Sequence, residues 1–433
     1  MIIVLISLMC CCGSDDPSTS GRVEVVFWHA MGGPLGDVLE DTLIADFNRT
    51  HPHIRVVPVN MGNYRALSQK IMASVMAGSP PAMAQAYETW TSQLIRGGVI
   101  VPLDSLMEAD PLYSRDEWDD FFMVFRENNT YDGRIYSFPF NKSVPLIYYN
   151  VDLYGQLGLV PAETWTEQRL LLKALCLDAN GDGDLLDEGD RWGTAFGPSV
   201  WTFECLLAQA GGSLLDDEGT RAAFNGPAGN EALGFLTDLL FVDRTAYLSS
   251  GYDHQRDFLN GGLGQVQGSV TSLAFMEQEM ERRRASGLPS FTIGVAALPG
   301  HTERRVFIAG TNVVLFRNQD SRVVDAGWEF IRWFTSSEQQ ARWAAGSGYL
   351  PAGRSSLDDP LMERKFIDYP GLLAVVLQVE TALHEPQATA WYDGREFLSE
   401  ALEIVLYGRM SAAEALERAA ALADAEIRLE AER

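Results

Sequence analysis

Positive charge is scarce in this chain. Its 433 residues include 33 Lys and Arg but 59 Asp and Glu, so the formal net charge is -26 at pH 7. The basic residues form no long cluster anywhere in the sequence. A protein of this charge is repelled by nucleic acids and by anionic surfaces. We therefore expect no nucleic-acid partner, although one local arginine is enough to hold one anionic ligand.

The short motifs of common enzyme classes are also missing. The sequence has no Gly-x-Ser-x-Gly elbow, no His-Glu-x-x-His, no Gly-x-x-x-x-Gly-Lys-Ser/Thr loop and no Gly-x-Gly-x-x-Gly. His51 and His53 have the spacing of two metal ligands on one strand face, but no third ligand follows nearby. The paired carboxylates of a glycosidase come from distant segments and leave no motif. A secreted carbohydrate-active enzyme therefore stays open as an alternative.

Cysteine is rare, with five residues in two groups. Cys10, Cys11 and Cys12 end the apolar run 2–9, which is too short to span a bilayer, and the polar stretch 13–21 follows. This order resembles a bacterial lipoprotein signal, in which a cysteine carries lipid and the polar stretch is a tether. We expect residues 1–21 to anchor an extracytoplasmic protein to a bacterial membrane. Cys176 and Cys205 either pair in an oxidising compartment or remain two buried thiols.

The length of the chain allows two lobes that share a cleft. Near the start, an apolar strand at 23–27 and a Gly/Pro turn at 32–36 precede a helix with one apolar side, and 53–59 is a second apolar strand. The apolar side of that helix consists of Leu39, Leu43, Ile44 and Phe47. Strand, helix and strand in this order predict an α/β fold with parallel strands, which place ligands at their carboxyl ends.

Three pairs of residues have the spacing of a capping box at a helix start. These pairs are Thr164 with Glu167, Thr335 with Glu338, and Ser411 with Glu414. The helix predicted from the third pair, 411–433, has one apolar stripe and is interpreted as a packing helix.

A segment rich in aspartate resembles a calcium-binding loop. Oxygen ligands occur at its positions 1, 3 and 5, and Gly183 occupies position 6, where such a loop turns tightly. Position 12 is Gly189 instead of Glu, but it is flanked by two acids. We expect a structural Ca²⁺ ion here, held by Asp178, Asn180, Asp182, Asp184, Glu188 and Asp190.

Several stretches, in the same order along the chain, resemble the extracellular solute-binding proteins of carbohydrate ABC importers. They are residues 25–29, 46–52, 62–64, 139–143, 148–150, 326–331 and 348–351. The resemblance implies a two-lobed periplasmic-binding-protein-like α/β fold with the ligand in a cleft between the lobes. Lobe one would comprise 22–138 and 269–340, and lobe two 139–268 and 341–433. It also implies a monomer without catalytic activity that delivers a small molecule to an ABC permease.

Within that family, the chain is similar to the members that bind glycerol 3-phosphate. The ligand residues implied by this resemblance are Tyr64, Glu88, Ser143, Trp201, Ser269 or Ser272, Gly310, Tyr349 and Arg395. Glu88 and Tyr64 suit the hydroxyl end of such a ligand, and the donors suit the phosphate, namely the serines, the Gly310 amide, Tyr349 and Arg395. Glycerol 3-phosphate or a glycerophosphodiester is therefore the expected ligand, with a neutral sugar or oligosaccharide as the alternative.

Overall fold

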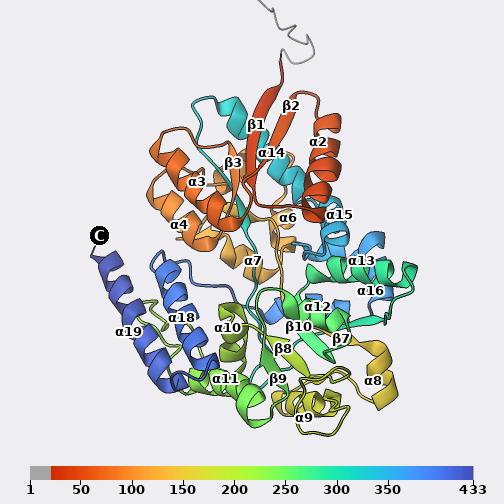
Figure 1. Cartoon of the computed structure of the whole chain (residues 1–433). Coiled ribbons are helices and arrows are strands. Elements are labelled where there is room, and N and C mark those ends of the chain that lie inside the picture. The colour runs from red at the N-terminus through yellow and green to blue at the C-terminus, as the bar shows by residue number, and fades with distance from the viewer. Residues whose placement is uncertain (1–20, 433) are drawn as a thin grey trace, which may run out of the picture.

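The computed structural model describes residues 21–432 and has two lobes, each built around its own β-sheet (Figure 1). The first lobe contains a five-stranded sheet in the order β2-β1-β3-β12-β6, and the second contains a three-stranded sheet in the order β10-β7-β11. The expected lipoprotein-like signal lies, except for Gly21, outside the described residues. No helix among residues 21–432 has the length and apolar character that a membrane crossing requires.

The first lobe starts with the expected strand, helix and strand. β1 (Val23–His29) and β2 (Ile54–Asn60) are parallel, and Val23 lies opposite Ile54. The helical segment between them consists of α1 (Pro34–Gly36), a π-helix η1 (Asp37–Ile44) and α2 (Ala45–Thr50). All four residues of the predicted apolar side, Leu39, Leu43, Ile44 and Phe47, are buried. This part of the fold is confirmed.

Three further strands of the sheet and several helices complete the first lobe. β3 (Met83–Ala86) continues the sheet parallel to β1, and β12 (Asn312–Leu315) runs antiparallel to both β3 and β6 (Ser137–Pro139). The helices and short strands of this part are α3 (Tyr64–Met76), α4 (Glu88–Arg96), α5 (Asp104–Ala109), α6 (Arg115–Asp120), α7 (Met123–Asn128), β4 (Thr130–Tyr131), β5 (Arg134–Ile135), α14 (Ser321–Phe334) and α15 (Ser337–Ser347).

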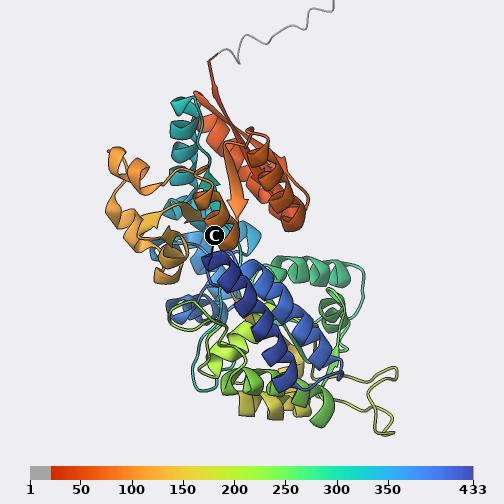
Figure 2. The same cartoon turned by 90° about the vertical axis from the view of Figure 1, so that its left-hand side faces the viewer.

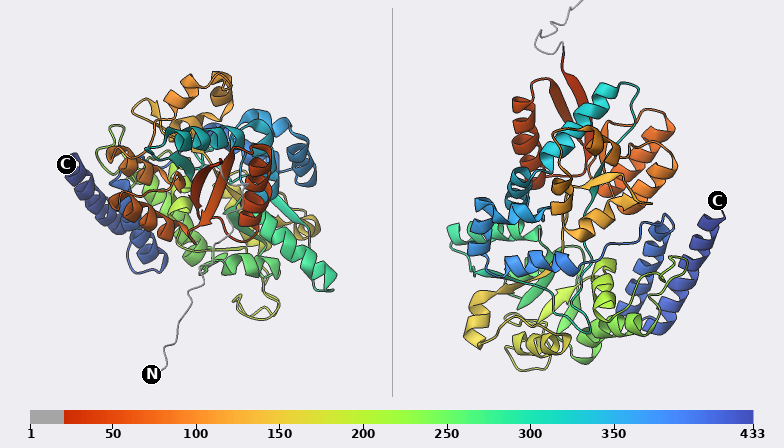
Figure 3. Two further views of the ribbon diagram at one scale, coloured as in Figure 1. Left: turned by 90° about the horizontal axis from the view of Figure 1, so that it is seen from above. Right: turned by 180° about the vertical axis from the view of Figure 1, so that it is seen from behind.

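The second lobe packs helices around β7 (Pro145–Asn150), β10 (Gln265–Ser269) and β11 (Ile293–Ala296). Its other elements are α8 (Val151–Leu157), α9 (Trp165–Leu175), β8 (Thr194–Phe196), α10 (Val200–Gln209), α11 (Pro227–Thr237), η2 (Asp238–Val242), β9 (Ala246–Leu248), α12 (Asp253–Leu259), α13 (Ser272–Ala285), η3 (Arg354–Asp358), α16 (Pro360–Asp368), α17 (Leu372–Leu377), η4 (Gln378–Thr381), α18 (Trp391–Leu406) and α19 (Ala412–Ala431). The C-terminal pair α18 and α19 lies side by side and packs on α10 and α11 (Figures 2 and 3).

The chain crosses between the lobes in segments that lie side by side. Ser143 pairs with Ala309 and Lys142 with Leu350 in antiparallel bridges. Sheet membership places the return crossing between β11 and β12, because β11 pairs with β7 in the second lobe. The expected return at residue 269 was therefore too early, since β11 belongs to the second lobe.

The predicted helix starts have different outcomes. Thr164 and Glu167 form a capping box at α9, and the hydroxyl of Ser411 accepts a bond from the Glu414 amide at α19. The prediction at Thr335 is wrong, because this residue ends α14 and its hydroxyl donates to the Ile331 carbonyl at 2.8 Å. Cys176 and Cys205 are both free thiols in the structure.

Candidate ligand-binding site

A cavity of about 410 Å³ is lined by residues from both lobes, and it contains five of the expected ligand residues. Tyr64 and Glu88 are the first residues of α3 and α4, and Glu88 closely follows the carboxyl end of β3. Trp201 on α10 and Arg395 on α18 face them from the second lobe, and Gly310 lies in a crossing segment. The site therefore lies where the parallel strands were expected to place it.

Glu88 is buried and belongs to a polar network that the sequence did not predict. Its Oε1 accepts a hydrogen bond from Asn128 Nδ2 at 2.6 Å and lies 3.7 Å from Lys142 Nζ. Lys142, only 1% exposed, donates to Asn128 Oδ1 at 2.6 Å, and Asn312 donates to the same oxygen. Burial lowers the pKa of Lys142 to about 8, while the negative charge of Glu88 opposes that shift. The ammonium thus compensates the Glu88 carboxylate from below the cavity.

Tyr64 is held by an amide of a crossing segment. Asn141 Nδ2 donates to the Tyr64 hydroxyl oxygen at 2.8 Å, and Asn141 Oδ1 accepts a bond from the Thr311 amide at 2.9 Å. Burial raises the pKa of Tyr64 well above its usual value. The phenol therefore keeps its proton at neutral pH and can donate it in a hydrogen bond to a ligand oxygen.

Arg395 already has a carboxylate partner in the cavity. Its Nε donates to Glu385 Oε1 at 3.1 Å, and the other carboxylate oxygen accepts a bond from Trp391 Nε1 at 3.1 Å. Burial alone would lower the pKa of Arg395, but the nearby carboxyl groups, Glu385 first, outweigh it and the pKa is raised. Because the ion pair uses Nε, the two terminal amino groups remain for a ligand.

Gly310 has a steric role that does not depend on any ligand. Its φ is +97°, and a Cβ atom there would lie 1.8 Å from the carbonyl oxygen of Asn141. Glycine is thus required for the close approach of two crossing segments. Gly310 also lines the first cavity.

Three of the four remaining expected residues line a second, adjacent cavity of about 760 Å³. Ser269, Ser272 and Tyr349 line it, and Trp201 lines both cavities. Ser143 is buried and reaches the site through Ser269, with 2.6 Å between the two hydroxyl oxygens. The structure thus brings the expected ligand residues to one region but divides all of them except Ser143 between two compartments.

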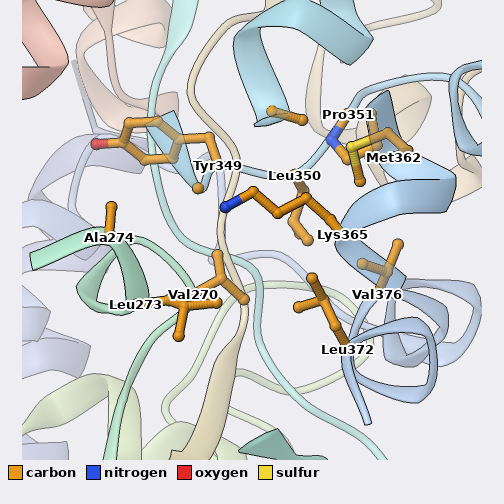
Figure 4. Close-up of a pocket in the computed structure, with 12 residues that line it drawn as sticks. Val270, Leu273, Ala274, Tyr349, Leu350, Pro351, Met362, Lys365, Leu372 and Val376 are labelled. Atoms are coloured by element: carbon orange, nitrogen blue, oxygen red, sulfur yellow. The ribbon is translucent and has the colours of Figure 1, made fainter. Parts of the chain in front are cut away.

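Tyr349 separates this region from a small apolar cavity of about 30 Å³ behind it. In Figure 4 its hydroxyl points away from the apolar side chains of Leu372 and Val376. The Tyr349 ring stacks on Trp343, with 5.5 Å between ring centroids. The small cavity is at most water-sized, so it is not a candidate for a solute.

The acidic loop brings together a set of carboxylates that differs from the expected ligand set. Asp182, Asp184 and Asp187 bring carboxylate oxygens within 4.8 Å of one another. Asp178 instead accepts bonds from the amides of Gly181 and Gly183. Asp190 likewise accepts bonds from the amides of Ala179 and Asp187. Asn180 turns its amide nitrogen toward Asp182 and Asp187, and Asp187 was not among the expected ligands.

Glu204 is a residue of this region that the sequence reasoning missed. Its side chain is 0% exposed, and neither carboxylate oxygen has a hydrogen-bond partner among residues 21–432. Burial, with the charge of Glu385 as a further cause, raises the pKa of Glu204 well above its usual value. The available signal was a single acid as the one charged residue within the mostly apolar sequence of α10.

We expect Glu204→Gln to change how stability depends on pH. Above the ordinary pKa of glutamate, the unfolded chain loses this proton while the folded chain keeps it, so the parent loses stability as pH rises through that window. The amide cannot ionise, so the variant should be more stable than the parent at pH 8, by roughly 1–3 kcal/mol, and nearly equal at pH 4.5. Urea unfolding at both pH values measures this, with the exposed Glu218→Gln as control. Parallel pH profiles for parent and Glu204→Gln would contradict the assignment.

Comparisons with known proteins also find solute-binding proteins. The family model described as bacterial extracellular solute-binding protein matches residues 42–373. The sn-glycerol-3-phosphate-binding periplasmic protein UgpB of Yersinia pseudotuberculosis is 24% identical over 425 residues, which cover 94% of this chain and 92% of the relative.

Two solved structures have the same fold. UgpB from Mycobacterium tuberculosis in complex with glycerophosphocholine aligns with a TM-score of 0.77 at 21% identity, covering 95% of this chain and 99% of the other. The cyclic alpha-maltosyl-1,6-maltose binding protein from Arthrobacter globiformis aligns with a TM-score of 0.77 at 23% identity, covering 94% of this chain and 100% of the other. The two-lobed α/β fold expected from the sequence is therefore confirmed.

Proposed function

The chain belongs to the bacterial extracellular solute-binding protein family and is the solute-binding subunit of an ABC importer, and we propose that its solute is glycerol 3-phosphate or a glycerophosphodiester. A small-molecule ligand, a membrane permease as partner and an extracytoplasmic location follow from the family. The proposal extends to a monomer that is lipid-anchored through the cysteines at 10–12 and that has no catalytic activity.

One observation carries the choice of solute: the charge arrangement of the first cavity. Glu88, Tyr64 and the exposed Arg65 line it from the first lobe, and Arg395 lines it from the second. A carboxylate accepts bonds from ligand hydroxyls and repels phosphate, whereas a guanidinium forms charge-assisted bonds with phosphate. A molecule with hydroxyls at one end and a phosphate at the other satisfies both sides. The name of the Yersinia relative supports the same solute.

A neutral oligosaccharide is the second candidate, and Glu385 favours it. Its carboxylate already neutralises Arg395, so the cavity does not require an anionic ligand for charge balance. The Arthrobacter neighbour binds such a sugar according to its title. The two candidates differ in charge, so binding measurements can separate them.

Isothermal titration calorimetry with glycerol 3-phosphate, glycerol and maltotriose tests the proposal. We expect glycerol 3-phosphate to bind and glycerol to bind far more weakly, because glycerol lacks the group that Arg395 would hold. The bound solute should be recovered unchanged after incubation. Binding of maltotriose alone would establish the second candidate, and hydrolysis of a glycoside or phosphodiester would establish an enzyme instead.

For the acidic loop we propose a structural Ca²⁺ ion, held by carboxylates of residues 178–190. The proximity of Asp182, Asp184 and Asp187 supports it, because three carboxylates this close repel one another unless a cation lies between them. A cation that binds only the folded state stabilises it, by about 2.7 kcal/mol at a hundred times its dissociation constant.

We therefore expect a chelator to lower the melting temperature of the calcium-loaded protein. The variant Asp182→Ala should melt at the lower temperature with or without the chelator. Asp217→Ala removes the same charge from an exposed position outside the loop and should keep the full response. A melting temperature of the calcium-loaded parent that does not respond to the chelator would show that no such ion stabilises the fold.

A further inference from the structure

The segment 384–390, which leads into α18, is bonded to the first lobe through Gln387. The side-chain nitrogen Nε2 of Gln387 donates to two carbonyls at the end of α7, to Glu127 at 3.2 Å and to Asn128 at 3.1 Å. Its backbone carbonyl accepts a bond from the hydroxyl of Ser92 on α4 at 2.5 Å. Gln387 therefore bonds to two helices of the first lobe, through both its side chain and its backbone.

The neighbours of Gln387 hold charged groups of the first cavity. Glu385 belongs to the same segment, lines that cavity and forms the ion pair with Arg395 of the second lobe. Asn128, whose carbonyl accepts a bond from Gln387, also donates its side-chain amide to Glu88 of the first lobe. The described residues that line the two cavities do not include Gln387 itself. Gln387 thus links charged groups of the two lobes without touching the space for a solute.

A second set of bonds joins α4 to the C-terminal helix. α19 runs along the second lobe, and its last turn reaches the end of α4 (Figure 1). There a carboxylate oxygen of Glu430 lies 2.7 Å from the guanidinium of Arg96. The other oxygen of Glu430 accepts a bond from the amide of Ala390 at the start of α18, and Arg96 also donates to the hydroxyl of Thr389. One carboxylate therefore connects the first lobe with both C-terminal helices, and the described lining of the cavities does not include Arg96 either.

We propose that Gln387 and Arg96 are positioning residues, which set the affinity for the solute by holding the two lobes together. Their bonds join α4 and α7 of the first lobe to the C-terminal part of the second, so they break when the lobes move apart. A solute held between two lobes binds to the closed form, and its apparent affinity is proportional to the fraction of protein that is closed. The inference rests on the proposed solute-binding function but not on the identity of the solute.

Small-angle scattering of the ligand-free protein tests the effect on closure. We expect the double variant Arg96→Ala with Gln387→Ala to have a larger radius of gyration than the parent, because its lobes separate more readily. Arg96→Ala alone changes a side chain that is 49% exposed, so it should fold normally and show a smaller increase. The matched control, Arg115→Ala with Gln69→Ala, removes an exposed ion-paired arginine and an exposed glutamine from within the first lobe and should keep the parent's radius. Equal radii of the parent and both test variants would overturn the inference, whichever solute the protein binds.

Calorimetry with glycerol 3-phosphate and maltotriose separates closure from direct contact with the solute. A smaller closed fraction weakens every solute that the parent binds by the same factor, about five- to thirtyfold for the double variant. Factors that differ between the two solutes would contradict the inference and make Arg96 or Gln387 a ligand residue. If the parent binds neither solute, the proposed choice of solute fails, while the scattering result still decides whether the two residues control closure.

Discussion

Replacing Lys142 by methionine is expected to lower the free energy of unfolding by about 3–5 kcal/mol, since it leaves a buried carboxylate without its counter-charge. Lys142 Nζ is 3.7 Å from Glu88 Oε1, and its bond to Asn128 orients the amide that donates to Glu88. Methionine has a similar length and fills the space, so little of the loss should come from a cavity. Urea denaturation of parent and variant at pH 7 measures the difference.

A double variant separates the charge effect from a packing effect. Glu88→Gln removes the uncompensated charge, so Lys142→Met combined with Glu88→Gln should recover most of the lost stability. If the double variant is as unstable as Lys142→Met, packing and not charge is responsible, and the electrostatic interpretation of this network is wrong.

The pH dependence gives a second check on Lys142. Its pKa is lowered to about 8 in the folded protein, below the ordinary value near 10.5 that applies to the unfolded chain. Between these two values the unfolded state binds the extra proton, so this group makes stability rise with pH in that window. The Lys142→Met variant lacks this contribution. Its stability relative to the parent should therefore fall further between pH 8 and 10.

The periodicity of apolar residues correctly predicted the first strand, helix and strand, because the buried residues of this segment recur at regular spacing within a short stretch of sequence. Leu39, Leu43 and Phe47 recur at helical spacing and all three are buried, and β1 and β2 are parallel as the crossover implied. The π-helix within this segment leaves no pattern that the sequence reasoning used. The sheet to which β11 belongs was not predicted either, because an apolar strand pairs equally well in either lobe until the tertiary contacts are known.

The site was predicted only as far as residue type and resemblance allowed. Tyr64, Glu88 and Arg395, which the resemblance implied as ligand residues, line one cavity in the structure. It did not separate the serines and Tyr349 into a second compartment, since that depends on how Trp201 lies between the lobes. Glu204 and Lys142 were missed because a buried charge is recognised by its surroundings, which distant segments supply.

Arg395→Ala is expected to weaken the binding of glycerol 3-phosphate by about ten- to a hundredfold and to leave the binding of neutral oligosaccharides unchanged. A charge-assisted hydrogen bond contributes roughly 1.5–3 kcal/mol, and that range corresponds to this loss of affinity. Removal of the guanidinium would also leave Glu385 facing the phosphate, which adds repulsion. Arg409→Ala removes an exposed arginine beyond the other end of α18 and should bind as the parent does.

Glu385→Gln also distinguishes the two candidate solutes, because it removes a negative charge from the cavity, whereas Arg395→Ala removes a positive one. The amide oxygen can accept a hydrogen bond from Arg395 or from Trp391, but the amide no longer neutralises the guanidinium or repels a phosphate. If the solute is a glycerol phosphate, this variant should bind it more tightly than the parent, while Arg395→Ala binds it more weakly. If the solute is a neutral sugar, neither change of charge should matter by more than a few-fold. For a phosphate ligand, calorimetry on the two variants should therefore show affinity changes of opposite sign. Equal affinity of the parent and Arg395→Ala for glycerol 3-phosphate would rule out the phosphate proposal.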